Sequence, residues 1–257
     1  MRASDGGPDG VAYLTVSTAD VQAAAAPAGG LEAFLSPLER ASSLRFRRAE
    51  DRLDYAASHA LFRLLAAWRL GGRVRSAAGL DVRRQCISCG STEHGKPWVK
   101  GVALSLSRSQ GLVMAAAGPD GLPLGADIEK VPAEIFPGFD EYAVAASELP
   151  GPDAPGLSDV ERIQLWVAKE AVLKAAGLGL ALDPSAVALL PAASPGAGVP
   201  AGRGAGLWRA GSPGNPSVDG LLAWSVPAPD GFAAAVAAGD GAPGRPVSLS
   251  EILATKL

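Results

Sequence analysis

Apolar and polar positions repeat along the chain with two periods, one typical of β-strands and one typical of α-helices. Strand-like runs, alternating or wholly apolar, cover residues 11–16, 102–107, 111–117, 122–129, 221–226 and 232–238. Helix-like stretches cover residues 55–70, 136–149 and 158–176. This mixture of elements predicts an α+β protein.

Two helices are predicted to begin at capping boxes. Ser158 and Glu161 have the S-x-x-E spacing in which each side chain satisfies a backbone N–H of the first turn, and Gly177 suits the end of the same helix. Ser36 and Glu39 have the same spacing, followed by a proline at the first helical position. Both helix starts therefore carry a local signal that does not depend on the rest of the fold.

The helix over residues 158–176 places charges on an apolar face. At about 100° per residue, an arc of roughly 60° contains Ile163, Val167, Glu170 and Lys174. Much of the remaining helix surface is apolar too, so we expect a largely buried helix. Buried charges persist when they are paired or bound to a metal, and they are frequently functional. Glu170 and Lys174 could also form an ordinary ion pair four residues apart on the helix. This segment alone does not decide between a functional site and such a pair.

The elements repeat in a way that predicts two similar α/β halves. Each half has an apolar helix that ends at glycine and strands that end in a hairpin, and the junction lies near residues 119–121. We expect a pseudo-dimer of residues 1–118 and 119–257, with the active site at the interface of the halves, because clefts between such units are favoured ligand sites.

Composition narrows the class of protein. The 257 residues are 48% hydrophobic and 19% charged, with a formal net charge of −3, which suits a globular protein with a proper core. The slight acidity argues against nucleic acid as the main partner. No apolar run approaches the roughly 18 residues that span a bilayer, and no signal peptide is apparent. We expect a cytoplasmic monomer that contacts no membrane.

A basic segment precedes the first long helix. Arg45, Arg47 and Arg48 lie around Phe46, with acidic residues interspersed on either side. A solvated helix face is the simpler interpretation. The alternative is a phosphate-binding patch, because clustered guanidinium groups fork onto phosphate oxygens.

A Cys-x-x-Cys pair raises the question of zinc. Cys86 and Cys89 precede His94, and the remaining histidine of the chain is His59. Zinc takes four ligands, so a carboxylate or water would have to complete the shell. Two reduced thiols in a turn are the default expectation.

Two carboxylates share one strand. Asp127 and Glu129 are predicted to point to the same side, with Ile128 facing the core. Like charges at this spacing repel unless solvent or a cation compensates, and oxygen ligands of this kind suit Mg²⁺. A solvated strand end is the alternative interpretation.

Together these pieces resemble the 4'-phosphopantetheinyl transferases of the surfactin-synthetase-activating type. The G-x-D-x-E signature of that family stands at residues 125–129, and its W-x-x-K-E-x-x-x-K signature stands at residues 166–174. A Gly-Lys-Pro element stands at residues 95–97, and similarity extends from the segment around Arg45 to the final hairpin. One departure is Arg108, which stands where the family commonly has a histidine associated with coenzyme A phosphate.

The resemblance implies an activity and a set of site residues. Such enzymes move the phosphopantetheine arm of coenzyme A to a serine of an apo acyl or peptidyl carrier protein of fatty acid, polyketide or nonribosomal peptide synthesis, releasing 3',5'-ADP. The implied Mg²⁺ ligands are Asp127, Glu129 and Glu170. The implied catalytic residues are Glu148, as the base for the carrier serine, with Lys174 and Glu170. The implied coenzyme A contacts are Arg45, Arg48, Lys96, Pro97, Ser107, Arg108, Ser109, Lys169 and Lys174.

Two other functions fit the same residues. A Mg²⁺-dependent nucleotide or pyrophosphate hydrolase could use the same carboxylates. A non-catalytic module could keep the fold and bind a carrier protein or coenzyme A, and Arg108 is the feature that favours this alternative.

Overall fold

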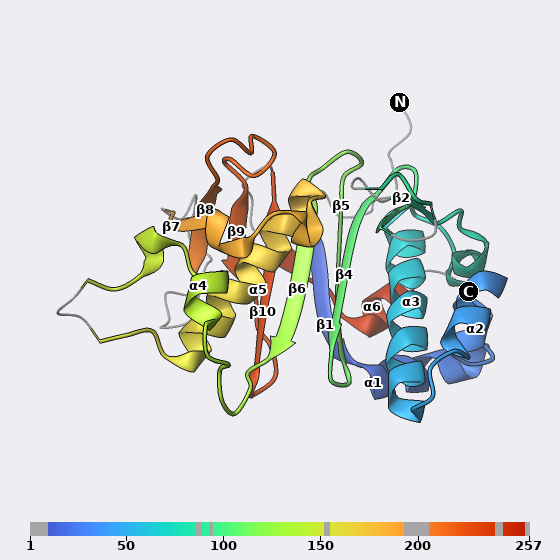
Figure 1. The fold of residues 1–257 in the computed structure, drawn as a ribbon. Helices are drawn as coiled ribbons and strands as arrows, with labels where there is room; N and C mark the ends of the chain where they lie inside the picture. Colours follow the sequence, from blue (N-terminus) through green and yellow to red (C-terminus); the bar gives the residue numbers. More distant parts are fainter. Residues whose placement is uncertain are drawn as a thin grey trace. The chain divides into compact units, whose positions relative to one another are not determined.

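The computed structural model describes residues 10–85, 89–92, 95–151, 155–192, 206–239 and 244–254. The chain forms two compact units (Figure 1). The first comprises Met1–Cys86, Ser91–Gly121 and Gly244–Leu257, and the second comprises Ile87–Gly90 and Leu122–Pro243. The boundary at residues 121/122 lies close to the predicted junction. The C-terminal segment, placed by the sequence prediction in the second half, belongs to the first unit.

The first unit is built on a four-stranded sheet. Its strands, in spatial order, are β11 (Arg245–Pro246), β1 (Ala12–Ser17), β5 (Leu112–Gly118) and β4 (Ala103–Ser109). β5 is antiparallel to both β1 and β4, whereas β11 is parallel to β1. A separate two-stranded sheet joins β2 (Arg83–Gln85) to β3 (Lys96–Trp98).

Helix α3 (Ala49–Arg69) forms the centre of the first unit's core. Its apolar residues pack in one cluster with β4 and β5, among them the fully buried Leu61, Leu65 and Val113. Short helices surround it, namely α1 (Thr18–Ala25), α2 (Pro37–Ser43) and α6 (Leu249–Leu253), with 3₁₀ turns at Ala26–Ala28, Leu31–Phe34 and Val74–Gly79. The continuous apolar run of α3 fits this burial, because a helix that is apolar around most of its surface must be covered.

The second unit is built on a five-stranded antiparallel sheet. Its strands, in spatial order, are β6 (Leu124–Lys130), β10 (Phe232–Ala238), β9 (Leu222–Ser225), β8 (Leu207–Gly211) and β7 (Ala188–Pro191). Helix α5 (Asp159–Ala176) lies along one face of this sheet (Figure 1). The remaining helical elements are α4 (Phe139–Ala143) and 3₁₀ turns at Ala146–Glu148, Gly179–Ala181 and Pro184–Ala186.

Gly125 lets strand β6 and helix α5 approach each other closely. A Cβ atom added at Gly125 would lie 1.8 Å from the Ala171 carbonyl oxygen and 2.7 Å from the Ala175 backbone nitrogen. Both atoms belong to the α5 backbone, so they cannot move aside as a flexible side chain would. The glycine of the G-x-D-x-E element is therefore required by packing, and it sets the distance from strand to helix two residues before Asp127.

Both capping boxes are confirmed. The Ser36 and Ser158 side chains accept hydrogen bonds from the backbone N–H groups of Glu39 and Glu161, and both glutamates bond back. Helix α5 ends at Gly177, which has a left-handed φ of 77°. These predictions held because capping is decided within four consecutive residues.

Other predicted boundaries were wrong. Helix α3 begins at Ala49, well before the predicted start, and includes part of the basic segment. The helix predicted over residues 136–149 is two short pieces, α4 and the 3₁₀ turn Ala146–Glu148. Strand β4 extends through Ser109, and the turn to β5 falls at Gln110 and Gly111, both with positive φ. A two-residue turn of this kind matches the twist of the strands that it joins.

The two units share the order of their central strands. The first strand of each pairs with the later strand of a hairpin, giving β1-β5-β4 in one and β6-β10-β9 in the other. The structure thus has the expected mixed α and β content in each unit. The pseudo-dimer stays a prediction. Among the described residues, every helix is too short or too polar to cross a membrane.

Candidate functional site

Strand β6 and helix α5 bring an acidic and a basic side chain together in the second unit. Asp127, which is 2% exposed, accepts a hydrogen bond from Lys174 Nζ to Oδ1 at 2.6 Å. The same Lys174 ammonium lies 3.3 Å from the Ala126 carbonyl oxygen. Gly125, Asp127 and Glu129 alternate along β6, so their side chains share the face on which α5 packs. Ile128 is buried on the opposite face, so the carboxylates face the helix that carries Glu170.

Glu170 is electrostatically coupled to both β6 carboxylates. Burial raises the pKa of Glu170, and the negative charges of Asp127 and Glu129 raise it further. The positive charge of Lys174 lowers it in part, and the resulting pKa is about 7. Its Oε1 atom is buried and has no hydrogen-bond partner among the residues that the structure describes. A buried carboxylate oxygen in this state is costly unless a proton or a cation compensates it.

The donor chemistry of these three carboxylates fits a hard cation. All their ligand atoms are oxygens, which Mg²⁺ prefers, and the repulsion that raises the pKa of Glu170 is the kind that a cation relieves. Within the described ranges, no three His, Cys, Asp or Glu side chains converge closely enough to form a finished metal site. The group thus offers suitable ligands that a cation would have to draw together.

Lys169 and Glu148 form a second buried ion pair on helix α5, towards the β7 edge of the sheet, opposite β6. Lys169 is 0% exposed, and its Nζ donates to Glu148 Oε2 at 2.5 Å and to the Ala143 carbonyl at 2.7 Å. The Glu148 carboxylate also accepts from the backbone N–H groups of Ala145 and Leu189 at 2.7 and 2.8 Å. The pair thereby ties α5 to α4 and β7. This arrangement does not favour the predicted roles of Lys169 at phosphate and of Glu148 as a base, because both groups are already engaged and buried.

The first unit contains a basic cavity of about 950 Å³. Its lining includes Arg45, Tyr55, His59, Arg84 and Trp98, and among the described lining residues Glu39 is the one acid. Arg45 lines this cavity, whereas Arg48, at the N-cap of α3, is exposed and outside the lining.

Lys96 and Pro97 of the Gly-Lys-Pro element lie on strand β3. Lys96 is half-buried, and this burial lowers its pKa to about 8. Pro97 pairs with Arg84 across the two-stranded sheet. Lys96 is suited to bind an anion, because an anionic oxygen beside it would stabilise the charged form of the ammonium group.

The side chains of the Ser107-Arg108-Ser109 run do not share one face of strand β4. The two serines and Arg108 alternate along β4, so they point to opposite faces of the sheet. The Arg108 guanidinium lies on the α3 side, 5.8 Å from the Phe46 ring centroid and 5.4 Å from that of Tyr55. Strand periodicity thus separates Arg108 from the two serines, and the prediction that all three contact coenzyme A stays a prediction.

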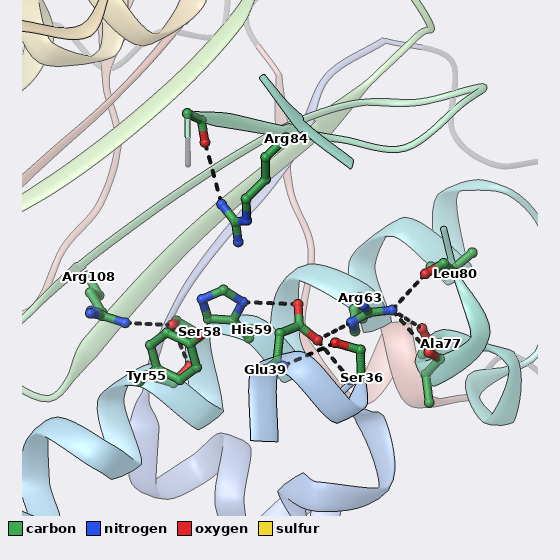
Figure 2. A network of polar contacts seen from close by, with 12 residues as sticks. Ser36, Glu39, Tyr55, Ser58, His59, Arg63, Ala77, Leu80, Arg84 and Arg108 are labelled. Carbon is green, nitrogen blue, oxygen red and sulfur yellow. Dashed lines mark hydrogen bonds and ion pairs between the residues drawn. The ribbon is translucent and has the colours of Figure 1, made fainter. Parts of the chain in front are cut away.

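A buried network around Glu39 was not predicted as part of a site (Figure 2). Glu39 Oε2 accepts from Arg63 Nε at 2.6 Å, and Glu39 Oε1 lies 3.1 Å from His59 Nδ1. Arg63 also donates to the carbonyls of Ala77 and Leu80 at 3.2 and 2.9 Å. The available signal was a histidine and an arginine in one otherwise apolar helical run, because such charges require partners when buried.

The predicted zinc alternative lies partly outside the described residues. Cys86 and His94 are not among them, whereas Cys89 is described and exposed. His59 is engaged with Glu39, as described above.

Comparison with known families addresses the second unit. Residues 123–209 match the model of the 4'-phosphopantetheinyl transferase superfamily. This segment resembles that superfamily. No curated protein matches the chain.

The matched segment contains the residues that form the acidic group. It begins just before β6, which carries Asp127 and Glu129, and it includes the whole of α5 with Glu170 and Lys174. The match supports a transferase of the phosphopantetheinyl class, with coenzyme A and carrier proteins as the general partners that the superfamily implies.

Proposed function

We propose that this protein is a Mg²⁺-dependent holo-acyl-carrier-protein synthase of the surfactin-synthetase-activating type. It transfers the phosphopantetheine arm of coenzyme A to a serine of an apo acyl or peptidyl carrier protein. The observation that carries the proposal is the coupling of Asp127, Glu129 and Glu170 within the segment that matches the superfamily.

The reaction is a displacement at phosphorus. The carrier serine oxygen forms a bond to the phosphorus that bears the pantetheine arm, the pyrophosphate P–O bond breaks, 3',5'-ADP leaves, and the serine proton is released. Catalysis of this kind depends mainly on positioning and on neutralising phosphate charge. Bound Mg²⁺ supplies such neutralisation at the pyrophosphate.

The chain's own residues have separate tasks in this proposal. Asp127, Glu129 and Glu170 hold the cation through oxygen atoms. Lys174, held at Asp127, donates to the departing phosphate. We assign Glu148 and Lys169 a positioning role, because their pair fixes α5 against its neighbours.

In the first unit, the cationic groups bind coenzyme A phosphate. Arg45 lines the basic cavity, and Lys96 is half-buried on β3. The charge of each favours an anionic ligand. Their contribution is to ground-state binding, so their loss should raise KM more than it lowers kcat.

Carrier mass provides the test. The protein is incubated with coenzyme A, Mg²⁺ and apo carrier proteins from fatty acid, polyketide and nonribosomal peptide synthesis. We expect at least one carrier to gain the mass of phosphopantetheine. Asp127→Asn and Glu170→Gln should reduce the rate by about 100-fold or more, whereas Asp230→Asn, an exposed carboxylate in a turn of the same unit, should not.

Other results would identify a different function. Phosphate release without any carrier would indicate a Mg²⁺-dependent pyrophosphate hydrolase. Coenzyme A binding without turnover on any carrier would indicate a non-catalytic module. Transfer by Glu170→Gln at the wild-type rate would remove Glu170 from the proposed metal ligands.

A further inference from the structure

Strand β7 is the outer strand at one end of the second unit's sheet (Figure 1). Directly after it, the Ala192 N–H donates to the Leu207 carbonyl of β8 at 2.9 Å. Because bonded and non-bonded pairs alternate along an antiparallel ladder, the backbone groups of residues 187, 189 and 191 face away from β8. An outer strand with open N–H and C=O groups is a template on which another chain can add a strand.

The three outward positions are closed in three different ways. The Val187 N–H donates to the Pro184 carbonyl at 3.1 Å, at the end of the preceding 3₁₀ turn. The Leu189 N–H donates to Glu148 Oε1 at 2.8 Å. Pro191 has no N–H to offer. Among the described residues, the outer side of β7 therefore has no N–H available to another chain.

The carboxylate at this edge is fixed by a buried lysine. The Glu148 and Lys169 side chains are 4% and 0% exposed, and Glu148 Oε2 lies 2.5 Å from Lys169 Nζ. The same Oε2 atom accepts from the Ala145 N–H at 2.7 Å. A strand added to β7 would have to place a carbonyl oxygen where a Glu148 oxygen already lies. The two acceptors would repel, so the carboxylate blocks the edge as well as capping one N–H.

The surface beside this edge is apolar. Leu190 on β7 is 53% exposed, and Val160 in the first turn of α5 is 50% exposed. Both line a groove of about 800 Å³ together with Trp208 of β8. A chain that paired with β7 would cover part of this apolar surface, which favours association. The edge therefore requires a block, and prolines and inward-facing charges are two means by which proteins provide one.

We propose that Glu148, held by Lys169, and Pro191 close the β7 edge against strand addition by a second copy of this chain. Two identical edges can pair about a two-fold axis, with residue 189 opposite residue 189 and residue 187 opposite residue 191. Every hydrogen bond of that ladder needs an N–H that is closed in both copies. The inference goes beyond the proposed transfer reaction and does not depend on it.

Sedimentation velocity of the full-length protein at about 10–100 μM tests the inference, because this range detects micromolar association. The opened variant combines Glu148→Ala, Lys169→Met and Pro191→Val. It offers N–H groups at positions 189 and 191 and leaves no member of the buried pair without its counter-charge. We expect this variant to self-associate at least about tenfold more tightly than wild type, because each restored N–H contributes a hydrogen bond between copies.

A matched variant separates opening of the edge from loss of stability. It combines Glu148→Gln, Lys169→Met and Pro155→Val. An amide oxygen at position 148 can still accept from the Leu189 N–H, and Pro155 is an exposed proline outside the strands. We expect this variant to associate no more than wild type. If it associates as strongly as the opened variant, destabilisation is the cause and the inference is overturned.

One further substitution locates the contact. Leu190→Lys, added to the opened variant, places a charge on the edge strand and should return the protein to the wild-type state of association. Association that persists in this variant lies elsewhere on the surface and overturns the inference. An opened variant that associates no more than wild type overturns it too, as does wild-type association that Leu190→Lys abolishes.

Hydrogen exchange of the wild-type protein gives an answer even where the opened variant does not fold. The Leu189 amide, bonded to a buried carboxylate, should exchange at least about 100-fold more slowly than in an unstructured peptide. Exchange near the rate of a free peptide would show that this N–H is open, and the inference would fall. Transfer to a carrier is measured separately, so the closed edge and the transferase proposal can fail independently.

Discussion

The Lys174 ammonium lies 2.6 Å from the Asp127 carboxylate, so the lysine links helix α5 to strand β6. In the sequence, Lys174 stands one helical turn after Glu170, and an i,i+4 pair within the helix was the simple expectation. The ion pair instead crosses between two elements. Lys174 therefore influences Glu170 through space while it holds the first carboxylate of the proposed metal group.

This relationship predicts how Glu170 titrates. Burial and the charges of Asp127 and Glu129 raise the pKa of Glu170, and the positive charge of Lys174 lowers it. The net value is about 7. Lys174→Gln removes the lowering contribution, so the Glu170 pKa should rise above 7. Carbon-13 NMR of labelled glutamate carboxyls, followed against pH without metal, measures it. Arg209→Gln, an exposed charge on β8, should cause no change, and an unshifted Glu170 in Lys174→Gln would refute the coupling.

The Glu39 network predicts a pH-dependent stability. The folded pKa of Glu39 is about 2, against an ordinary value of 4.5, so its stabilisation is complete above pH 4.5 and disappears as the pH falls towards 2. Glu39→Gln leaves the buried Arg63 without its counter-charge and should cost roughly 3 kcal/mol near pH 7. Denaturant unfolding at several pH values should show this difference shrinking below pH 4.5. Glu32→Gln, an exposed glutamate nearby, is the control, and a constant difference would contradict the prediction.

Gly125→Ala should destabilise the second unit. The new Cβ would lie 1.8 Å from the Ala171 carbonyl oxygen, so β6 and α5 must move apart and lose packing. We expect a loss of about 3 kcal/mol or more in unfolding free energy, or failure to fold. Gly156→Ala is the matched control, because a Cβ there meets nothing within 4 Å. Equal stability of the two variants in denaturant unfolding would show that the close approach is not required.

The pair of Lys169 and Glu148 predicts a non-additive mutant cycle. Lys169→Met leaves a buried carboxylate without its counter-charge and should cost about 3–5 kcal/mol of unfolding free energy. Adding Glu148→Gln to that variant removes the uncompensated charge and should restore part of the loss. Denaturant unfolding of both single variants and the double variant measures the coupling. Additive effects would instead leave room for separate roles of the two residues at a ligand.

Short-range features of this protein could be predicted from its sequence. The capping boxes at Ser36 and Ser158 and the glycine end of α5 depend on hydrogen bonds and φ values within a few residues. The strands of the two hairpins follow from apolar runs and turn residues. The helix boundaries that were predicted wrongly, at the start of α3 and around α4, lie where polar residues interrupt the helical repeat of apolar residues.

Which buried charges pair was decided only by the tertiary structure. Glu39 meets Arg63 across 24 positions, Lys169 meets Glu148 across 21, and Lys174 meets Asp127 across 47. The sequence located the carboxylates of β6 and α5 and the glycine before them, but it grouped Ser107, Arg108 and Ser109 together and left His59 aside. The physical reason is range: helix caps and periodicity act between neighbours, whereas the partner of a buried charge depends on which distant segments pack against it.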